Sequence, residues 1–339
     1  HLLSRRQRQM CIRDRLQKKV KMPTSIGYGN GYEVSYMNSG KMTNKGWEFR
    51  VDAVPFENRD WRVGFYFNIA HNENKITEMP DNYTEENYTF NNGEYAYRRE
   101  EGRPMGSFYG YRYKGVCQNK DATYARDADG NVMKDISGNA IVMRNGTATI
   151  APGDALYEDI NHDGVINQYD IVYLGNSNPR FTGGAGVNVS YKQFKLSAIF
   201  YGRYGQDVVN STRLNNESMR GIDNQSTAVL RRWRNEGDQT DIPRALYGEG
   251  YNTLGSDRFV EDASYLRLKS LSFNYRLPKK IIQRWGFSNI DVYVTGYNLF
   301  TWTKYTGQDP EVKTENTYAR DSATTPASIQ LVAGFNLSF

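Results

Sequence analysis

The sequence predicts an all-β protein, namely part of an antiparallel transmembrane β-barrel with long extracellular loops. Several stretches alternate apolar and polar residues with a period of two, which is the pattern of a strand with one apolar face. Short and long connections between these stretches alternate along the chain, as they do in bacterial outer-membrane barrels. The 339 residues have a mean hydropathy of -0.74 and contain no run of 18 apolar residues. This excludes a transmembrane helix but leaves a barrel open.

The closing stretch, residues 329–339, shows the alternation most clearly. Its apolar side consists of Ile329, Leu331, Ala333, Phe335, Leu337 and Phe339, and its other side consists of Gln330, Val332, Gly334, Asn336 and Ser338. The length is about the 9–11 residues with which a tilted strand crosses a bilayer. The final aromatic side chain suits the aromatic girdle where hydrocarbon meets water. An edge strand of a soluble sandwich is the alternative for this stretch.

Six earlier stretches show the same pattern. Residues 46–54 and 61–70 form a predicted hairpin around a turn at 55–60, and residues from 181 and from 194 form another around 192–193. Alternation then returns at 271–277 and, after a short connector at 278–289, in a penultimate strand that starts at Ile290. The pattern therefore predicts about seven membrane crossings. Bacterial barrels have an even number of strands, so seven crossings indicate part of a larger protein.

The long connections are residues 72–178, 203–263 and 303–326, and they are rich in Asn, Asp, Tyr and Gly. If the closing strand descends to the periplasm, every short connector falls on the periplasmic side. This assignment holds only if the strand-like piece at 108–116 makes no crossing, so we place that piece inside the extracellular excursion. The surplus of 26 Tyr over 15 Phe suits interfaces and wet cavities.

The net charge of +5 comes from the amino-terminal residues. Residues 1–22 hold eight of the 43 Lys and Arg and one acid, so the remainder has 35 basic and 37 acidic residues. This balance argues against a nucleic-acid partner. Residues 1–20 are predicted to be a non-native basic tail, with a genuine basic tail as the alternative, and residues 21–339 are predicted to form the barrel. Cys11 and Cys117 cannot form a disulfide framework.

Residues 159–170 match the spacing of a calcium-binding loop. Oxygen ligands fall at loop positions 1, 3 and 5, a glycine falls at position 6, and a backbone carbonyl, a polar residue and a carboxylate fall at positions 7, 9 and 12. The predicted ligands are Asp159, Asn161, Asp163, Val165, Asn167 and Asp170. Position 12 is Asp rather than the longer Glu. A metal-free Asx-rich turn is the alternative. The predicted cofactor is therefore a structural Ca²⁺.

Catalytic and nucleotide-binding interpretations find little support. The chain has three His, and only His71 and His162 lie outside the basic tail, neither within a catalytic motif. The glycine-rich piece at 183–186 starts a strand rather than a helix, so it fails the context test for a nucleotide-binding loop. Small residues there suit a strand that bends or packs closely. We expect neither catalytic nor organic cofactor-binding residues.

Several stretches, in order over residues 25–339, resemble the carboxy-terminal part of SusC/RagA-type TonB-dependent outer-membrane transporters. They are 44–48 (NKGWE), 108–111 (FYGY), 157–164 (YEDINHDG), 174–176 (LGN) with Pro179, 257–268 (DRFVEDASYLRL), 298–305 (NLFTWTKY), 309–311 (DPE) and 335–339 (FNLSF). The resemblance implies a large plugged barrel, and transporters of this general type have 22 strands. It also implies energy supplied through the TonB complex and a SusD-like surface lipoprotein as a lid. The plug, the TonB-contacting segment, the signal peptide and most of the earlier strands of such transporters are not expected in this sequence.

The leading hypothesis is therefore a fragment of an active importer of oligosaccharides or peptides in the Gram-negative outer membrane. The alternative is a self-standing surface or adhesive β-protein with a calcium-stabilised loop, and an outer-membrane enzyme ranks third. Trp233, Trp302 and the loop tyrosines are candidates for ligand contact.

Overall fold

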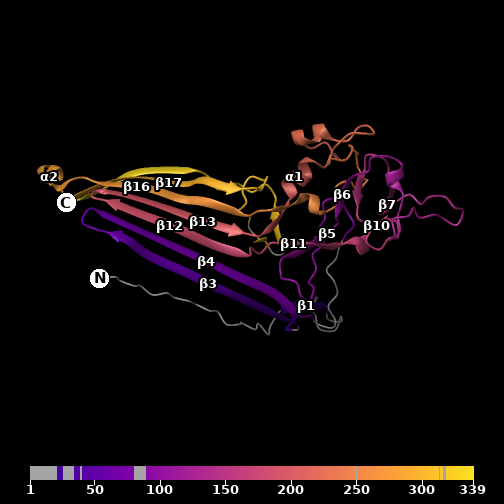
Figure 1. Ribbon diagram of the computed structural model, residues 1–339, viewed down its shortest axis with the longest axis horizontal. Helices are drawn as coiled ribbons and strands as arrows, with labels where there is room; N and C mark the ends of the chain where they lie inside the picture. The colour runs from indigo at the N-terminus through magenta and orange to yellow at the C-terminus, as the bar shows by residue number, and fades with distance from the viewer. Residues whose placement is uncertain are drawn as a thin grey trace.

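The computed structural model describes residues 21–25, 34–38, 40–79, 89–248, 250–312, 314–315 and 318–339, so the predicted basic tail lies outside it. Its main feature is one seven-stranded antiparallel sheet in which every neighbour in space is also the next crossing in sequence (Figure 1). The strands are β3 (Lys41–Glu57), β4 (Trp61–Glu78), β12 (Phe181–Tyr191), β13 (Phe194–Tyr204), β16 (Tyr265–Arg276), β17 (Asn289–Thr303) and β20 (Gln330–Ser338). The sheet has the seven long strands that the alternating pattern predicts, so this prediction is confirmed.

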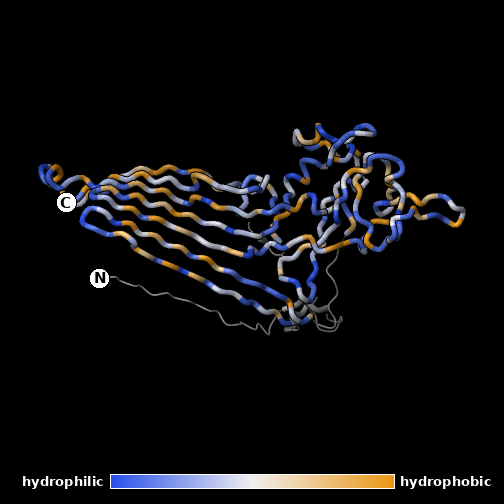
Figure 2. The backbone as a smooth tube through the Cα atoms, viewed as in Figure 1, coloured by the Kyte–Doolittle hydropathy of each residue, from blue (hydrophilic) through white to orange (hydrophobic). Residues whose placement is uncertain are grey.

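Side chains alternate between the two faces of this sheet, and Figure 2 shows the alternation as colour changes along each strand. On β20, Leu331, Phe335 and Leu337 are exposed on one face and pair with apolar residues of β17 such as Val292. The other face carries hydroxyl, amide and charged groups. One exposed apolar face opposite one polar face is the pattern of a membrane barrel wall.

The hairpin between β3 and β4 turns later than predicted. β3 runs through Pro55 to Glu57, and its register shifts between Ala53 and Phe56. Pro55, which lacks a backbone N–H, lies within this shift and has no register partner on β4, and such irregular positions tolerate proline. The side chain of Asn58 accepts N–H groups of Asp60 and Trp61 at 2.9 and 2.7 Å and closes the turn.

The second hairpin has the predicted two-residue turn, with Tyr191 paired to Phe194. Lys192 adopts a positive φ of 51°, as such tight turns require. The connector between β16 and β17 forms a short helix, α2 (Lys279–Ile282), and a 3₁₀ turn, η5 (Gln283–Trp285). The short connectors lie at the same end of the sheet as the carboxyl terminus (Figure 1).

The long connections pack together at the opposite end into a lobe (Figure 1). The predicted piece at 108–116 forms two short strands inside this lobe, paired with β11 and β9 rather than with the seven-stranded sheet. The strands of the lobe are β5 (Ser107–Gly110), β6 (Tyr113–Val116), β7 (Arg144–Asn145), β8 (Ala148–Thr149), β9 (Ala155–Tyr157), β10 (Val165–Ile166), β11 (Val172–Asn176), β14 (Asp207–Asn210), β15 (Val260–Asp262), β18 (Thr314–Glu315) and β19 (Tyr318–Asp321).

Short helices complete the lobe. They are η1 (Asp121–Thr123), η2 (Gln168–Asp170), α1 (Ser211–Asn216), η3 (Thr227–Arg231) and η4 (Asp257–Phe259). Two further strands, β1 (Lys21–Ser25) and β2 (Val34–Asn38), pair with each other in a separate hairpin. Within the described ranges, no helix has the length and hydrophobicity to cross a membrane.

The lobe has its own apolar core, which the polar composition of its loops did not indicate. Tyr109, Tyr111 and Tyr157 are fully or almost fully buried in a cluster that includes Ile166 and Leu254. The tyrosine surplus, expected at wet cavities, therefore serves in part as core. The long connections are joined by backbone pairing too, because β14 pairs with both β15 and β19.

Candidate functional site

The polar face of the sheet carries a hollow of about 440 Å³ over strands β13, β16 and β17. Hydroxyl groups dominate it, and the hydroxyls of Ser272 and Thr295 are hydrogen-bonded at 2.8 Å. Arg276 donates to Asp291 at 2.9 Å, so these two charges are paired. The remaining lining residues are Lys195, Ser197, Ile199, Ser270, Asn274 and Tyr297. The wall therefore presents neutral hydrogen-bonding groups and few free charges.

The loop that follows β17 folds back onto this wall and is held there by ion pairs. Arg267 of β16, whose side chain is 3% exposed, donates to Asp309 at 2.5 Å and to Glu311 at 2.9 Å. Its Nε also donates to Thr301 at 2.9 Å, and Lys269 pairs with Glu311 at 2.7 Å. Two cations of the wall thus compensate two anions of the loop. We call these four charged residues, Arg267, Lys269, Asp309 and Glu311, the wall clamp.

Asp309 is charged within the clamp despite its partial burial. Burial alone would raise the pKa of its carboxyl group. The backbone N–H groups of Ala327 and Glu311 and the Arg267 guanidinium outweigh burial and lower the pKa below the ordinary 3.8. Gln206 of the neighbouring loop adds a hydrogen bond to the carbonyl of Pro310 at 3.2 Å. The clamp is therefore an ionic contact between the wall and the loop that follows β17, reinforced by backbone groups, and Gln206 joins a second loop to it by a hydrogen bond.

The predicted calcium loop is compact, with its carboxylates turned toward backbone N–H groups of the loop itself. Asp159 accepts the N–H of Gly164 at 2.7 Å, and Asp170 accepts the N–H groups of Ile160 and Asn167, each at 2.8 Å. The amide of Asn161 donates to Asp163 at 3.0 Å. The Val165 carbonyl accepts from the Asn167 side chain at 3.0 Å. The structure thus brings the six predicted ligands into one loop.

The loop concentrates negative charge without a cation to balance it. Burial, and to a lesser degree the charge of Asp159, raises the pKa of Asp170. No Lys or Arg of the described part of the chain forms an ion pair with Asp159, Asp163 or Asp170. Within that part, no group of three His, Cys, Asp or Glu side chains stands arranged to hold a metal. The potential metal ligands of the loop also include amide and carbonyl oxygens, and Ca²⁺ prefers a set of ligands that are all oxygens.

The predicted ligand-contacting aromatic residues lie elsewhere. Trp302 is 52% exposed on the apolar outer face of the sheet, away from the polar wall. Trp233 is buried within the lobe, against Gly153. Alternation along β17 and the folding of the loops decide these positions, and residue type alone does not. Tyr297, which is exposed, is the aromatic residue among those that line the polar hollow.

The wall clamp was not predicted. Its members lie in two stretches that carry the resemblance, 257–268 and 309–311, or directly beside them. The sequence signal was a Lys/Arg pair on one face of a strand and an Asp-Pro-Glu turn further on. Predicting that these groups pair would require knowing that the last long loop folds back over the wall.

Comparisons with known proteins give consistent relatives. TonB-dependent receptor P3 of Formosa agariphila is 32% identical over 304 residues, which cover 87% of this chain and 28% of that protein. TonB-dependent receptor SusC of Bacteroides thetaiotaomicron is 25% identical over 336 residues, which cover 96% of this chain and 29% of that protein. No model of a known protein family matches the chain.

Solved structures agree with these relatives. The RagAB peptide importer in its closed-closed state superposes with a TM-score of 0.68 at 25% identity, covering 96% of this chain and 33% of that chain. A second structure of the RagAB peptide transporter gives a TM-score of 0.65 at 26% identity. This chain spans about a third or less of the length of the relatives it matches.

Proposed function

This chain belongs to the SusC/RagA-type TonB-dependent transporters, and from that premise we propose that it forms the carboxy-terminal barrel wall of an outer-membrane nutrient importer. The sheet with one apolar and one polar face, roofed at one end by a packed lobe, carries this proposal. In the whole protein the polar face would line a lumen that holds a plug. The TonB complex would act through the plug region, outside this sequence.

We propose oligosaccharides as the imported class. Sugar hydroxyl groups pair well with neutral donors and acceptors, and the polar hollow is rich in Ser and Thr hydroxyls beside the ring of Tyr297. The charges there are mostly compensated, as in the pair between Arg276 and Asp291. Peptides are the second class, because the related RagAB is a peptide importer.

Growth of the host on single nutrients tests this function. The gene is deleted, and growth is compared on defined oligosaccharides and on peptides as the sole carbon source. Complementation uses wild type, Tyr297→Ala on the polar wall, and Val294→Ala on the opposite face of the same strand as a matched control. We expect the deletion strain to lose growth on oligosaccharides. Wild type and V294A should restore this growth, whereas Y297A should restore it poorly. A peptide-specific defect would select the second class, and no defect on either would contradict import.

We propose that a SusD-like lipoprotein docks on the lobe. Apolar side chains that are exposed next to one another mark protein contacts, whereas single ones do not; Ile222 and Tyr247 are 94% and 79% exposed on adjoining segments of the lobe. Their segments adjoin, because the backbone N–H of Gly248 donates to the carbonyl of Arg220 at 2.9 Å. A separate polar pocket of the lobe, of about 580 Å³, lies beside them and is lined by Asn215, Asn224 and neighbouring residues.

We propose that residues 159–170 bind one structural Ca²⁺. Asp159, Asn161, Asp163, Asn167 and Asp170 would supply side-chain oxygens, and Val165 would supply its carbonyl. The uncompensated carboxylates support this assignment. A ligand that binds only the folded state raises the unfolding temperature, so Ca²⁺ is expected to raise it for wild type and not for Asp159→Asn. Asp127→Asn, in a neighbouring hairpin turn, is the control. An equal response of wild type and D159N, or none in either, would contradict calcium binding.

A further inference from the structure

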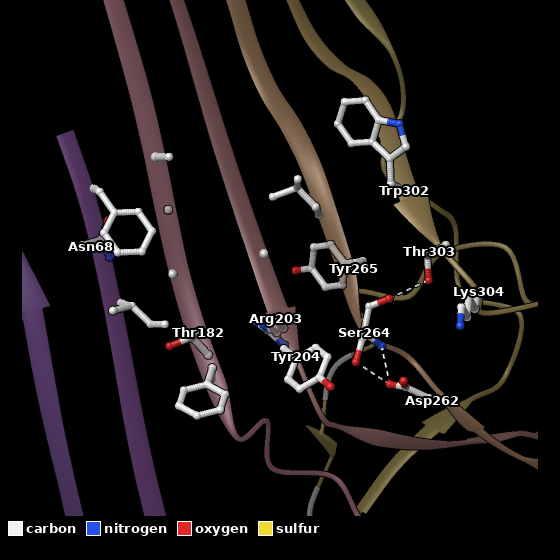
Figure 3. A pocket seen from close by; sticks show the side chains of 18 residues that line it. Asn68, Thr182, Arg203, Tyr204, Asp262, Ser264, Tyr265, Trp302, Thr303 and Lys304 are labelled. Carbon is white, nitrogen blue, oxygen red and sulfur yellow. Dashed lines mark hydrogen bonds between the residues drawn. The ribbon is translucent and has the colours of Figure 1, made fainter. Parts of the chain in front are cut away.

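A groove of about 670 Å³ lies on the apolar outer face of the sheet, near the strand ends that carry the lobe (Figure 3). It is on the face opposite to the polar hollow, so import through the lumen does not use it. Its walls include Phe67, Ile69, Leu266 and Trp302. An apolar hollow on this face is a candidate binding site for an apolar ligand.

Strand register creates the groove. Ile69, Gly183, Gly202, Leu266 and Trp302 occupy one row across five neighbouring strands, each paired with the next. The second and third positions are glycines and lack side chains, while the other three are large. Neighbouring strands lie about 4.8 Å apart, so the bare strip is roughly 10 Å wide. A strip of this width between apolar walls suits one extended hydrocarbon chain.

Both glycines are required by the sheet itself. A Cβ at Gly183 would lie 2.5 Å from the carbonyl oxygen of Asn68, and a Cβ at Gly202 would lie 2.7 Å from that of Tyr265. The prediction that small residues at 183–186 allow close packing of strands is therefore confirmed at Gly183. Since only glycine fits at these two positions, no side chain fills the strip between the apolar walls. Ala185 continues its floor one row further along β12.

Aromatic rings frame the groove on two sides. Phe181 lies between His71 and Tyr204, with ring centroids 5.1 and 6.4 Å away. On the other side, Trp302 contacts Phe200 at 6.4 Å. Trp and Tyr side chains concentrate at the membrane–water boundary, so the groove begins at that boundary and extends toward the apolar interior.

The end of the groove next to the lobe is polar and carries a free cation. Lys304, the hydroxyl of Tyr204 and Thr303 lie there (Figure 3). The Asp262 carboxylate lies there too and is held by Ser264, because it accepts the backbone N–H of Ser264 at 2.9 Å and also the Ser264 hydroxyl. Lys304 forms no ion pair with any residue that the structure describes. The groove thus combines an apolar channel with a polar mouth, where Lys304 is a cation left unpaired among the described residues and the Asp262 carboxylate is engaged by Ser264.

We propose that this groove seats one acyl chain of an anionic membrane lipid whose phosphate pairs with Lys304. The proposal rests on the proposed function in one respect: the outer face of the sheet must lie in the outer membrane. An apolar chain with an anionic head matches both ends of the groove, because the chain would fill the strip over Gly183 and Gly202 while the head meets Lys304 at the aqueous boundary.

Retention of lipid by the complete protein tests the proposal. Wild type, Ala185→Phe, Lys304→Glu and a control, Ala198→Phe, are extracted from membranes in mild detergent and analysed by native mass spectrometry. Ala198 is an outward-facing alanine of β13 that does not line the groove. Each is then reconstituted with phosphatidylglycerol or phosphatidylcholine of identical chains. We expect wild type and A198F to retain one anionic lipid and A185F to retain at least fivefold less. K304E should lose the preference for phosphatidylglycerol.

The outcomes separate this proposal from the proposed function. Retention by A185F equal to wild type, or an unchanged lipid preference in K304E, would overturn the lipid site. K304E keeps the test decisive if A185F fails to fold, because Lys304 lies outside the strands. Membrane fractionation of every variant serves as the folding control. Absence of wild type from the outer membrane would overturn both proposals, whereas its presence there without retained lipid would overturn the lipid site alone.

Discussion

Arg267 and Asp309 lie 42 residues apart in the chain, yet their side chains meet at 2.5 Å on the polar wall of the sheet. Arg267 is a strand residue and Asp309 is a loop residue. Their contact therefore joins the wall of the sheet to the last long loop. Removal of either partner leaves a partly buried charge without compensation, which is costly in a protein interior.

Arg267→Ala is expected to lower the free energy of unfolding by on the order of 3 kcal/mol and to expose residues 304–312 to protease. Arg276→Ala is the control, because its ion pair with Asp291 is on the same face but largely exposed on the arginine side. An exposed pair contributes less than about 1 kcal/mol. Denaturant unfolding and limited proteolysis measure both effects. Equal losses in the two variants would show that the clamp does not hold the loop.

The clamp also predicts a dependence on pH. The pKa of Asp309 is lower in the folded protein than its ordinary value of 3.8. Its charge therefore stabilises the fold above that ordinary pKa, and this contribution is lost as the pH falls through the lowered value. The difference in unfolding temperature between wild type and Asp309→Asn is expected to be full at pH 7 and to shrink below about pH 4. A difference that stays constant to pH 2 would contradict the assignment.

Tyr305→Phe tests the buried hydrogen bond between the Tyr305 hydroxyl and Asp321, which is 2.6 Å long. Burial, followed by the hydrogen bond to Asp321, raises the pKa of Tyr305, so the hydroxyl remains a donor well above neutral pH. The substitution removes one donor from a buried carboxylate and is expected to cost about 1–3 kcal/mol in the free energy of unfolding. Tyr247→Phe, at an exposed position, is expected to change nothing measurable. A Y305F protein as stable as wild type would contradict this account.

Cys117 is expected to resist alkylation in the folded protein. Burial, and then the charge of Asp154, raises the pKa of its thiol to about 11, and its side chain lies within the lobe core. Thiolate is the reactive form, so a Cys11→Ser variant should label with maleimide at pH 7.5 only after denaturation. Mass spectrometry measures the fraction of Cys117 that maleimide has labelled. Rapid labelling of the native variant would show that the lobe core is open.

Ile222→Asp is expected to reduce copurification of a SusD-like lipoprotein at least tenfold, because it places a charge in an apolar contact. Ile136→Asp is the matched control at another fully exposed isoleucine of the lobe. Affinity purification from the host with quantitative mass spectrometry measures the retained partner. Equal retention by both variants would place the partner's contact elsewhere on the protein.

The number and the facing of the strands were available from the sequence, because both are local properties. Side chains alternate along any extended strand, so residues such as Phe335 and Asn336 are assigned to opposite faces without a structure. Connector length distinguished the two ends of the sheet. Local pattern failed at Pro55, where β3 continues through a proline because its register shifts there.

The calcium loop was predicted as a set of ligands because its residues are contiguous. The wall clamp and the outer groove were not, since each depends on contacts between distant segments. Arg267 meets Asp309 only after a loop folds back over the wall, and Gly183 faces Gly202 only in one strand register. Likewise, residue type suggested that Trp302 contacts ligand, whereas its position in the register directs it to the outer face.

Sequence alone determined that this chain forms seven long strands with an apolar and a polar face. Periodicity and connector length depend only on residues that are close together in the sequence. Tertiary structure alone decided that tyrosines such as Tyr109 form the core of a lobe, that charges clamp a loop to the wall, and that two glycines open a groove. The physical reason is that burial, ion pairing and cavity shape depend on which segments meet in space, and that pairing becomes defined only when the whole sheet has assembled.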